Sequence, residues 1–157
     1  MKLIKEENPI WDIEKENIVG KVEGGTFNLD NLEVGTQLHQ EWWKLIDDND
    51  RVLGFGWINY ENGDFEISLA VHKDYQGSGS GSIIIEGLES IAKEKGFNKT
   101  VAIVKKTNPN SLKMIKWLYQ KKYMAYWMGL EGMEPKSQEF AINIVQKMDI
   151  ELIKELT

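Results

Sequence analysis

The chain has 157 residues, a length typical of one domain with a single buried core. It contains no cysteine and two histidines, which excludes disulfides, thiolate nucleophiles and cysteine-ligated metals and disfavours a histidine-rich metal site. The net charge of -6 and a single arginine disfavour nucleic-acid binding, which depends on basic surface. No run approaches the length of a membrane-spanning helix, so we expect a cytoplasmic protein that binds no membrane.

Residues 1–40 show the weakest pattern, with scattered glycines and short apolar stretches that match no regular element. From residue 41 the pattern sharpens, because turns rich in Asp, Asn and Gly separate stretches of strand-forming residues. Three strands are expected in order: Glu41–Ile46, Val52–Tyr60 and Phe65–Val71. Gly54 and Gly56 inside the second strand indicate a bulge or a close approach of another backbone.

A helix is expected next, over Ile83–Lys95, because apolar residues recur there with helical spacing. Gly96 is a natural end for this helix, and the β-branched stretch Thr100–Val104 follows as a strand. Strand, helix and strand would then form a parallel crossover.

Four further elements complete the expected order. They are a helix over Ser111–Tyr119, strands over Tyr123–Leu130 and Phe140–Met148, and one or two helical turns over Asp149–Leu156. No repeat or linker divides the chain, so residues 1–157 are interpreted as one domain.

A glycine-rich loop, Gln76–Ser82, joins the third strand to the first predicted helix. A chain that enters a helix through glycines exposes amide N–H groups at the positive end of the helix, which can bind a pyrophosphate. A Rossmann dinucleotide site would need Gly-x-Gly-x-x-Gly. Neither Gly77-x-Gly79 nor Gly79-x-Gly81 has a glycine three residues further on, and the lysine of a P-loop is also absent.

The loop and the order of elements resemble the GNAT superfamily of acyl-CoA-dependent N-acetyltransferases. The signature of that family, (Arg/Gln)-x-x-Gly-x-(Gly/Ala), reads here Gln76-Gly77-Ser78-Gly79-Ser80-Gly81. The resemblance extends over about Glu41 to Tyr123, whereas residues 1–40 form an atypical opening. It implies an α/β (α+β) fold: a mixed, mostly antiparallel sheet of six to seven strands flanked by helices, with the parallel β-α-β crossover at the CoA site.

The resemblance also implies which residues bind acetyl-CoA. Leu69 and Val71 would offer backbone groups to the pantetheine arm. Asn108 or Asn110 would touch that arm, and the alternative for either is to cap the following helix. The pyrophosphate would be held by the loop backbone, from residues Gln76, Gly77, Ser78, Gly79, Ser80, Gly81 and Ser82.

Two residues are candidates for the chemistry in this resemblance. Glu66 would deprotonate the amine, whose ordinary pKa is about 10.4. Strand alternation puts Glu66 on the face opposite the side chains of Leu69 and Val71, which is the wrong face for the chemistry unless a bulge intervenes. Tyr119 would protonate the CoA thiolate, or would only pack. If Lys122 and Tyr123 correspond to the usual Gly-Phe ending of the family's helix, the tyrosine position falls on Leu118 instead.

Six tryptophans are unusual for this length. Trp42 and Trp43 must point to opposite faces of a strand, so one could line a substrate groove, and Trp127 lies where the family's acceptor site is often walled. An aromatic wall suits a flat or cationic acceptor.

The predicted function is transfer of an acetyl group from acetyl-CoA to a primary amine by direct attack, without a metal. The acceptor is a small-molecule amine or a protein amine. The alternative is a catalytically inactive acyl-CoA-binding regulatory module. The oligomeric state is left open, a homodimer included.

Overall fold

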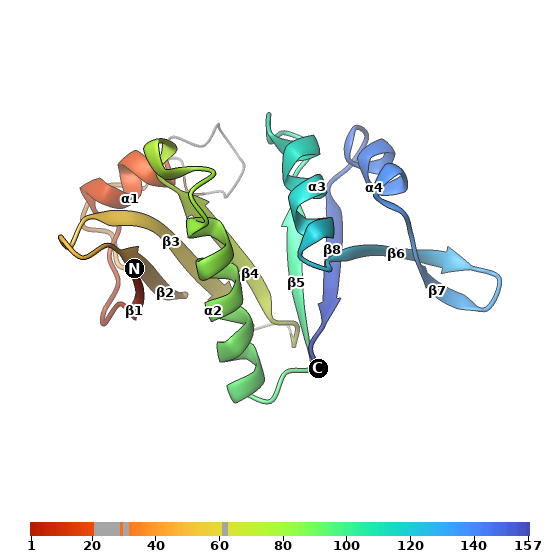
Figure 1. Cartoon of the computed structure of the whole chain (residues 1–157), viewed down its shortest axis with the longest axis horizontal. Coiled ribbons are helices and arrows are strands. Elements are labelled where there is room, and N and C mark those ends of the chain that lie inside the picture. Colours follow the sequence, from red (N-terminus) through yellow and green to blue (C-terminus); the bar gives the residue numbers. More distant parts are fainter. Residues whose placement is uncertain (21–28, 30–31, 61–62) are drawn as a thin grey trace.

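The computed structural model describes residues 1–20, 29, 32–60 and 63–157. Eight strands in the described residues form one sheet in the order β1-β2-β3-β4-β5-β8-β6-β7 (Figure 1). The strands are β1 (Lys2–Lys5), β2 (Glu41–Ile46), β3 (Val52–Asn59), β4 (Glu66–Val71), β5 (Lys99–Val104), β6 (Met124–Gly129), β7 (Gly132–Pro135) and β8 (Ile150–Glu155). Neighbouring strands are antiparallel except β4 and β5. The mixed, mostly antiparallel sheet is therefore confirmed, with one strand more than the six to seven expected.

Four helices and one short 3-10 turn accompany the sheet in the described residues. They are α1 (Ile13–Ile18), η1 (Lys73–Tyr75), α2 (Ser80–Glu94), α3 (Ser111–Gln120) and α4 (Gln138–Val145). The expected parallel crossover is confirmed, because β4, α2 and β5 follow one another and β4 pairs with β5 in parallel. None of the helices in the described ranges is both long and apolar enough to cross a membrane.

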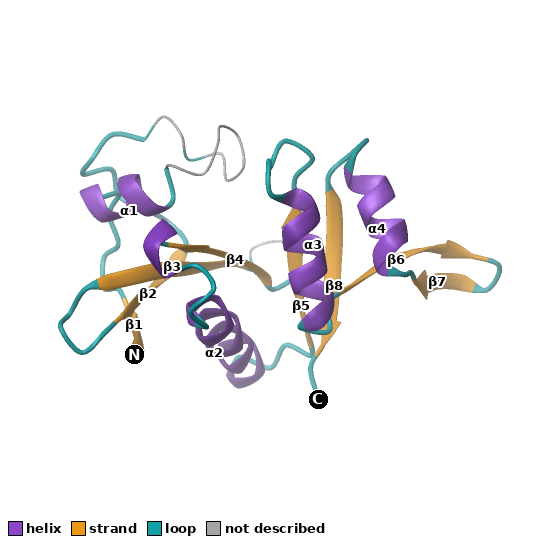
Figure 2. Ribbon diagram, turned by 45° about the horizontal axis from the view of Figure 1, so that its top comes forward, coloured by secondary structure: helices purple, strands orange, loops and turns teal. Residues whose placement is uncertain are grey.

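The sheet has a core on each face. Ile67 of β4 packs with Ile84 and Leu88 of α2 in the larger core, which also includes residues of α3 and α4. Ala70 of β4 packs with Ile18 of α1 in the smaller core on the other face. Helices α1 and α2 thus lie on opposite sides of β3 and β4 (Figure 2).

The two glycines of β3 allow α2 to lie very close to the sheet. A Cβ atom on Gly54 would lie 2.9 Å from Cδ1 of Ile84 and 2.7 Å from the carbonyl oxygen of Ala70 in β4, and one on Gly56 would lie 2.7 Å from Cγ2 of Ile84. The expected close approach is therefore confirmed, although its partner at Gly56 is a helix side chain rather than a backbone. The helix that carries the glycine-rich loop is fixed against the sheet at this contact.

Two predictions for the C-terminal region were wrong. The stretch Phe140–Met148, expected as a strand, contains α4, because the Ser137 side chain accepts a hydrogen bond from the Phe140 amide and caps a helix that buries Ala141 and Val145. The stretch Asp149–Leu156, expected to be helical, contains β8. Its residues Ile150 and Leu152 alternate with exposed Glu151, the period of a strand.

Strand β8 inserts between β5 and β6, with six residue pairs to β5 and two to β6. Only Met124 and Ala125 of β6 pair with β8, so the rest of the β6–β7 hairpin extends beyond the sheet (Figure 1).

Candidate functional site

A cavity lies where β4 and β5 separate. The two strands pair at Glu66 and Val101, where the Val101 amide donates to the Phe65 carbonyl at 2.9 Å. Beyond this point they diverge and leave a cavity of about 220 Å³ between them. The separation of the two strands is visible in Figure 1. This is the place where an extended ligand could lie between two strands of the sheet.

The cavity has an apolar side and a polar side. Ile85 of α2 and Met114 and Trp117 of α3 line it from the helical face of the sheet. On the other face, the lining side chains form two cross-strand pairs between β3 and β4. Trp57 is opposite Ser68, and Asn59 is opposite Glu66. The cavity therefore gives Glu66 access to the gap from the face opposite α2. Alternation along β4 alone puts Glu66 on the opposite face from Leu69 and Val71. The separation of β4 and β5 is what allows its carboxyl to reach the gap between the strands.

The backbone of β4 directs amide groups into this gap that make no ladder bond to β5. The His72 amide donates to the Leu53 carbonyl of β3 at 2.8 Å, whereas the Phe65 carbonyl faces β5. Because backbone groups alternate sides along a strand, the amides of Leu69 and Val71 face the gap as Phe65 does. The Val71 carbonyl also accepts a hydrogen bond from the Gln76 side chain at 3.3 Å.

The glycine-rich loop ends at the start of α2. Gly77 and Gly79 have φ of +80° and +91°, a conformation that suits glycine, and Gly79 is the N-cap of α2. Helix α2 begins at Ser80, three residues before the predicted start. Gly79 supplies no side-chain acceptor, and the first amides of a helix have no intrahelical acceptor. The N-terminus of α2 can therefore accept an anion such as a phosphate group.

Serine hydroxyls fix the shape of this loop. The Ser78 hydroxyl bonds to the Tyr75 carbonyl and lies 2.9 Å from the hydroxyl of buried Ser80. Upstream, the His72 ring accepts a hydrogen bond from the Asp74 amide at 3.0 Å and caps η1. The loop thus reaches α2 in a conformation set by its own side chains.

Glu66 has the electrostatic environment of a base. Burial raises the pKa of its carboxyl above the ordinary value, and the negative charge of Glu151 raises it further, against a lowering by Lys105. Glu66 lines the cavity and is half-buried. A raised pKa makes a carboxylate a stronger base. In the described residues no group of three or more metal-ligating side chains is arranged to hold a metal ion.

Tyr119 lies outside the cavity lining, and its hydroxyl bonds to the backbone. The hydroxyl has one proton to share between the carbonyls of Lys136 (2.9 Å) and Ser137 (3.1 Å), and it accepts from the Ala125 amide (3.0 Å). Burial raises the pKa of this phenol. These bonds connect α3 to β6 and to the segment before α4.

The conformation at the end of α3 also bears on Tyr119 as the candidate acid. Lys122 has φ of +74°, a left-handed conformation that favours glycine. This supports the register in which Lys122 stands at the family's glycine, and which puts the family's tyrosine position on Leu118. Leu118 lines the cavity.

The structure separates the two candidate asparagines. Asn108 is buried, lines the cavity, and accepts a hydrogen bond from the Asn110 amide at 2.8 Å. Asn110 is exposed and occupies the N-cap position of α3 without a side-chain cap bond.

Trp57 is a wall residue that sequence reasoning missed. It lines the cavity and stacks on buried Trp42, with ring centroids 4.4 Å apart. Trp43 packs against the larger core, and Trp127 contacts Phe140 next to the projecting hairpin. A signal for Trp57 was available in the sequence. Trp57 and Asn59 stand two residues apart in β3, so their side chains share one face of the sheet, and this face also carries Glu66.

The Acetyltransferase (GNAT) family matches residues 7–118 of the chain. This match spans most of the sequence and includes the separated strands and the loop. The chain belongs to the GNAT acetyltransferase family. The GNAT chain is thus an acyltransferase. No curated protein matched it in sequence.

Several solved structures share the fold of this chain. A candidate acetyltransferase from Acinetobacter baylyi ADP1 is 14% identical over 99% of this chain and 92% of its own, with a TM-score of 0.60. The ribosomal-protein-S18-alanine N-acetyltransferase of Escherichia coli is 15% identical over 75% of this chain and 72% of its own, with a TM-score of 0.51. A candidate acetyltransferase from Salmonella typhimurium, solved with acetyl-CoA, is 17% identical over 75% of this chain and 65% of its own, with a TM-score of 0.53. At these identities the likeness is one of fold.

Proposed function

We propose that this GNAT protein transfers the acetyl group of acetyl-CoA to a primary amine by direct attack. The observation that carries the proposal is the cavity between β4 and β5, which has free β4 amides along one edge and Glu66 on its polar face. The Salmonella structure contains acetyl-CoA on the same fold, which supports this cosubstrate. The N-terminus of α2 suits its pyrophosphate.

Each part of the site has one role in this scheme. The amides from Gln76 to Ser82 bind the pyrophosphate, apart from that of Ser78, which donates to the Tyr75 carbonyl at 3.3 Å. The amides of Leu69 and Val71 bind the pantetheine arm as an added strand would. Asn108 is the asparagine beside that arm, since it lines the cavity. The apolar side formed by α2 and α3 excludes water from the thioester.

The chemical step needs a neutral amine. Glu66 accepts a proton from the ammonium form, whose ordinary pKa is about 10.4, and the amine nitrogen then attacks the thioester carbonyl carbon. A β4 amide near Val71 stabilises the negative charge on the carbonyl oxygen. The attacking nitrogen then loses its second proton to solvent, the carbon–sulfur bond breaks, and CoA leaves as a thiolate. In this scheme the thiolate takes its proton from solvent, because the Tyr119 hydroxyl already donates to backbone carbonyls. Tyr119 as the acid stays a prediction.

The experiment follows free thiol release from acetyl-CoA with a panel of small primary amines and a lysine peptide, beside calorimetric binding of CoA. We expect thiol release with at least one amine, and a large loss of kcat in Glu66→Gln with CoA binding retained. CoA binding without thiol release from any acceptor would overturn the proposal and favour the inactive acyl-CoA-binding module. Unchanged kcat in Glu66→Gln would remove Glu66 as base. The cytoplasmic location, the single domain of residues 1–157 and the oligomeric state stay predictions.

A further inference from the structure

A second cavity adjoins the first on the polar side. It has a volume of about 470 Å³ and lies among the end of β1, the start of β2 and the end of β3. Gln40 and Asn59 line both cavities. A molecule whose reactive amine lies at Glu66 can therefore extend past these two residues into the second cavity.

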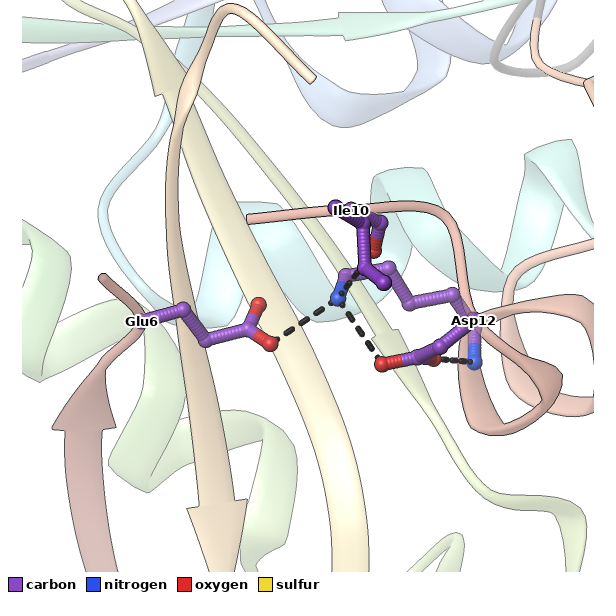
Figure 3. A network of polar contacts seen from close by, with 4 residues as sticks. Glu6, Ile10 and Asp12 are labelled. Carbon is purple, nitrogen blue, oxygen red and sulfur yellow. Dashed lines mark hydrogen bonds and ion pairs between the residues drawn. The ribbon is translucent and has the colours of Figure 1, made fainter. Parts of the chain in front are cut away.

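Two glutamates in the lining each have one carboxylate oxygen in an ion pair. Oε1 of Glu6 accepts from Nζ of Lys15 at 2.9 Å, and Lys15 is fully buried beside Asp12 (Figure 3). Oε1 of Glu41 accepts from Nζ of Lys5 at 2.7 Å. Both glutamate side chains are almost buried, with exposed fractions of 12% and 13%.

The second oxygen of each carboxylate is buried without a hydrogen-bond partner among the described residues. Most buried polar atoms in folded proteins have such a partner, and an unpaired carboxylate oxygen is among the most unfavourable exceptions. These oxygens are enclosed by protein, so a ligand does not bond to them directly, but a cation in the cavity would offset the negative charge of both carboxylates.

The charges around the cavity also favour a cation. Four carboxylates stand there against three ammonium groups, those of Lys5, Lys15 and Lys95. The carboxylates are Glu6, Glu7, Asp12 and Glu41. The Tyr60 ring is a further wall of the cavity, and its centroid lies 5.3 Å from Nζ of Lys95.

We propose that the second cavity binds the distal ammonium group of a linear di- or polyamine acceptor. The carboxylates of Glu6 and Glu41 in the cavity wall attract its positive charge, while the other amine of the same molecule reaches Glu66 past Gln40 and Asn59. This inference rests on the proposed function and names the acceptor class of the same site.

The test compares putrescine with n-butylamine, which has the same carbon chain and one amine. We expect kcat/KM with acetyl-CoA to be at least about tenfold higher for putrescine, because the carboxylates attract its second positive charge. Glu41→Gln should remove most of this preference. Glu86→Gln, the same charge change at an exposed position of α2, should leave it intact. Glu6→Gln is the second variant, should Glu41→Gln fail to fold.

Binding without acetyl-CoA separates this inference from the proposed function. Calorimetry should show putrescine, but not n-butylamine, bound to the wild-type protein, with binding weakened in Glu41→Gln. Equal kcat/KM for the two amines would overturn the inference and leave the transferase intact. Putrescine binding that depends on Glu41, with no thiol release from any amine, would support the cavity and overturn the transferase. Turnover of a lysine peptide alone would overturn the small-molecule acceptor.

Discussion

The sharpest test of the CoA loop places a carboxylate at the start of α2. Glycine substitutions in the loop are poor probes, because Gly77 and Gly79 have positive φ and a side chain there would strain the backbone whether or not a ligand binds. Ser82 has no such constraint, since it is the third residue of α2. Ser82→Asp adds one negative charge next to the first amides of the helix, and Ser82→Asn is its neutral match.

The two effects of Ser82→Asp have opposite signs. A carboxylate at a helix N-terminus stabilises the fold by about 0.3 to 1 kcal/mol. Unit charges about 5 Å apart in water interact by about 0.8 kcal/mol, so a pyrophosphate with about two charges is disfavoured by about 1.7 kcal/mol. The dissociation constant of CoA should therefore rise by about 15-fold, and by more at lower effective dielectric.

Calorimetric titration with CoA and thermal unfolding measure the two effects in one protein. We expect Ser82→Asp to melt at or above the wild-type temperature and to bind CoA about 15-fold more weakly at low salt. Raising the salt should shrink the difference. Ser82→Asn should bind within about threefold of wild type, since it adds no charge. Wild-type affinity in Ser82→Asp, with the melting temperature raised, would show that the pyrophosphate lies elsewhere.

Three further predictions concern charged and hydroxyl groups. The pKa of Glu66 is raised in the folded protein, so ionisation of this carboxyl opposes folding. The stability that the protonated carboxyl contributes is complete below its ordinary pKa of about 4.3 and is lost as the pH rises through the raised pKa. Glu66→Gln should therefore melt higher than wild type at neutral pH but not at about pH 4, and a uniform decrease in melting temperature would contradict this. Tyr119→Phe should lower the free energy of unfolding by about 1 to 3 kcal/mol, because the buried Ala125 amide loses its acceptor, and should leave the pH profile of kcat unchanged. A folded variant with a displaced basic limb would instead assign the acid to Tyr119. Lys15→Met should destabilise the protein by about 3 to 5 kcal/mol in chemical denaturation, because Glu6 keeps a buried charge without its partner. Adding Glu6→Gln should recover part of that loss, and no recovery would show that packing of Lys15 between Trp42 and Phe55 dominates.

The sequence by itself determined the elements whose signals are local. The turns that flank β2 and β3 and the alternation along β4 predicted those strands to within one residue, and the glycines of Gln76–Ser82 predicted a loop that leads into a helix and suits an anion. Local signals for α4 and β8 were also present, in the Ser137 cap and the alternation of Ile150 and Leu152. They were missed because the apolar run within α4, which includes Ile142, Ile144 and Val145, suggested a strand.

Only the tertiary structure decided where the chemistry can occur. Alternation along β4 puts Glu66 and Leu69 on opposite faces, and no pattern in the chain shows that β4 and β5 pair at one point and then separate. That separation joins the two faces in one cavity, because a gap between strands is open to side chains from both sides of a sheet. The contacts of Glu6 with Lys15 and of Glu41 with Lys5 depend likewise on how β1, β2 and α1 meet in space. Binding of the cosubstrate can be inferred from a contiguous motif, whereas the environment of the acceptor is built from residues far apart in the chain.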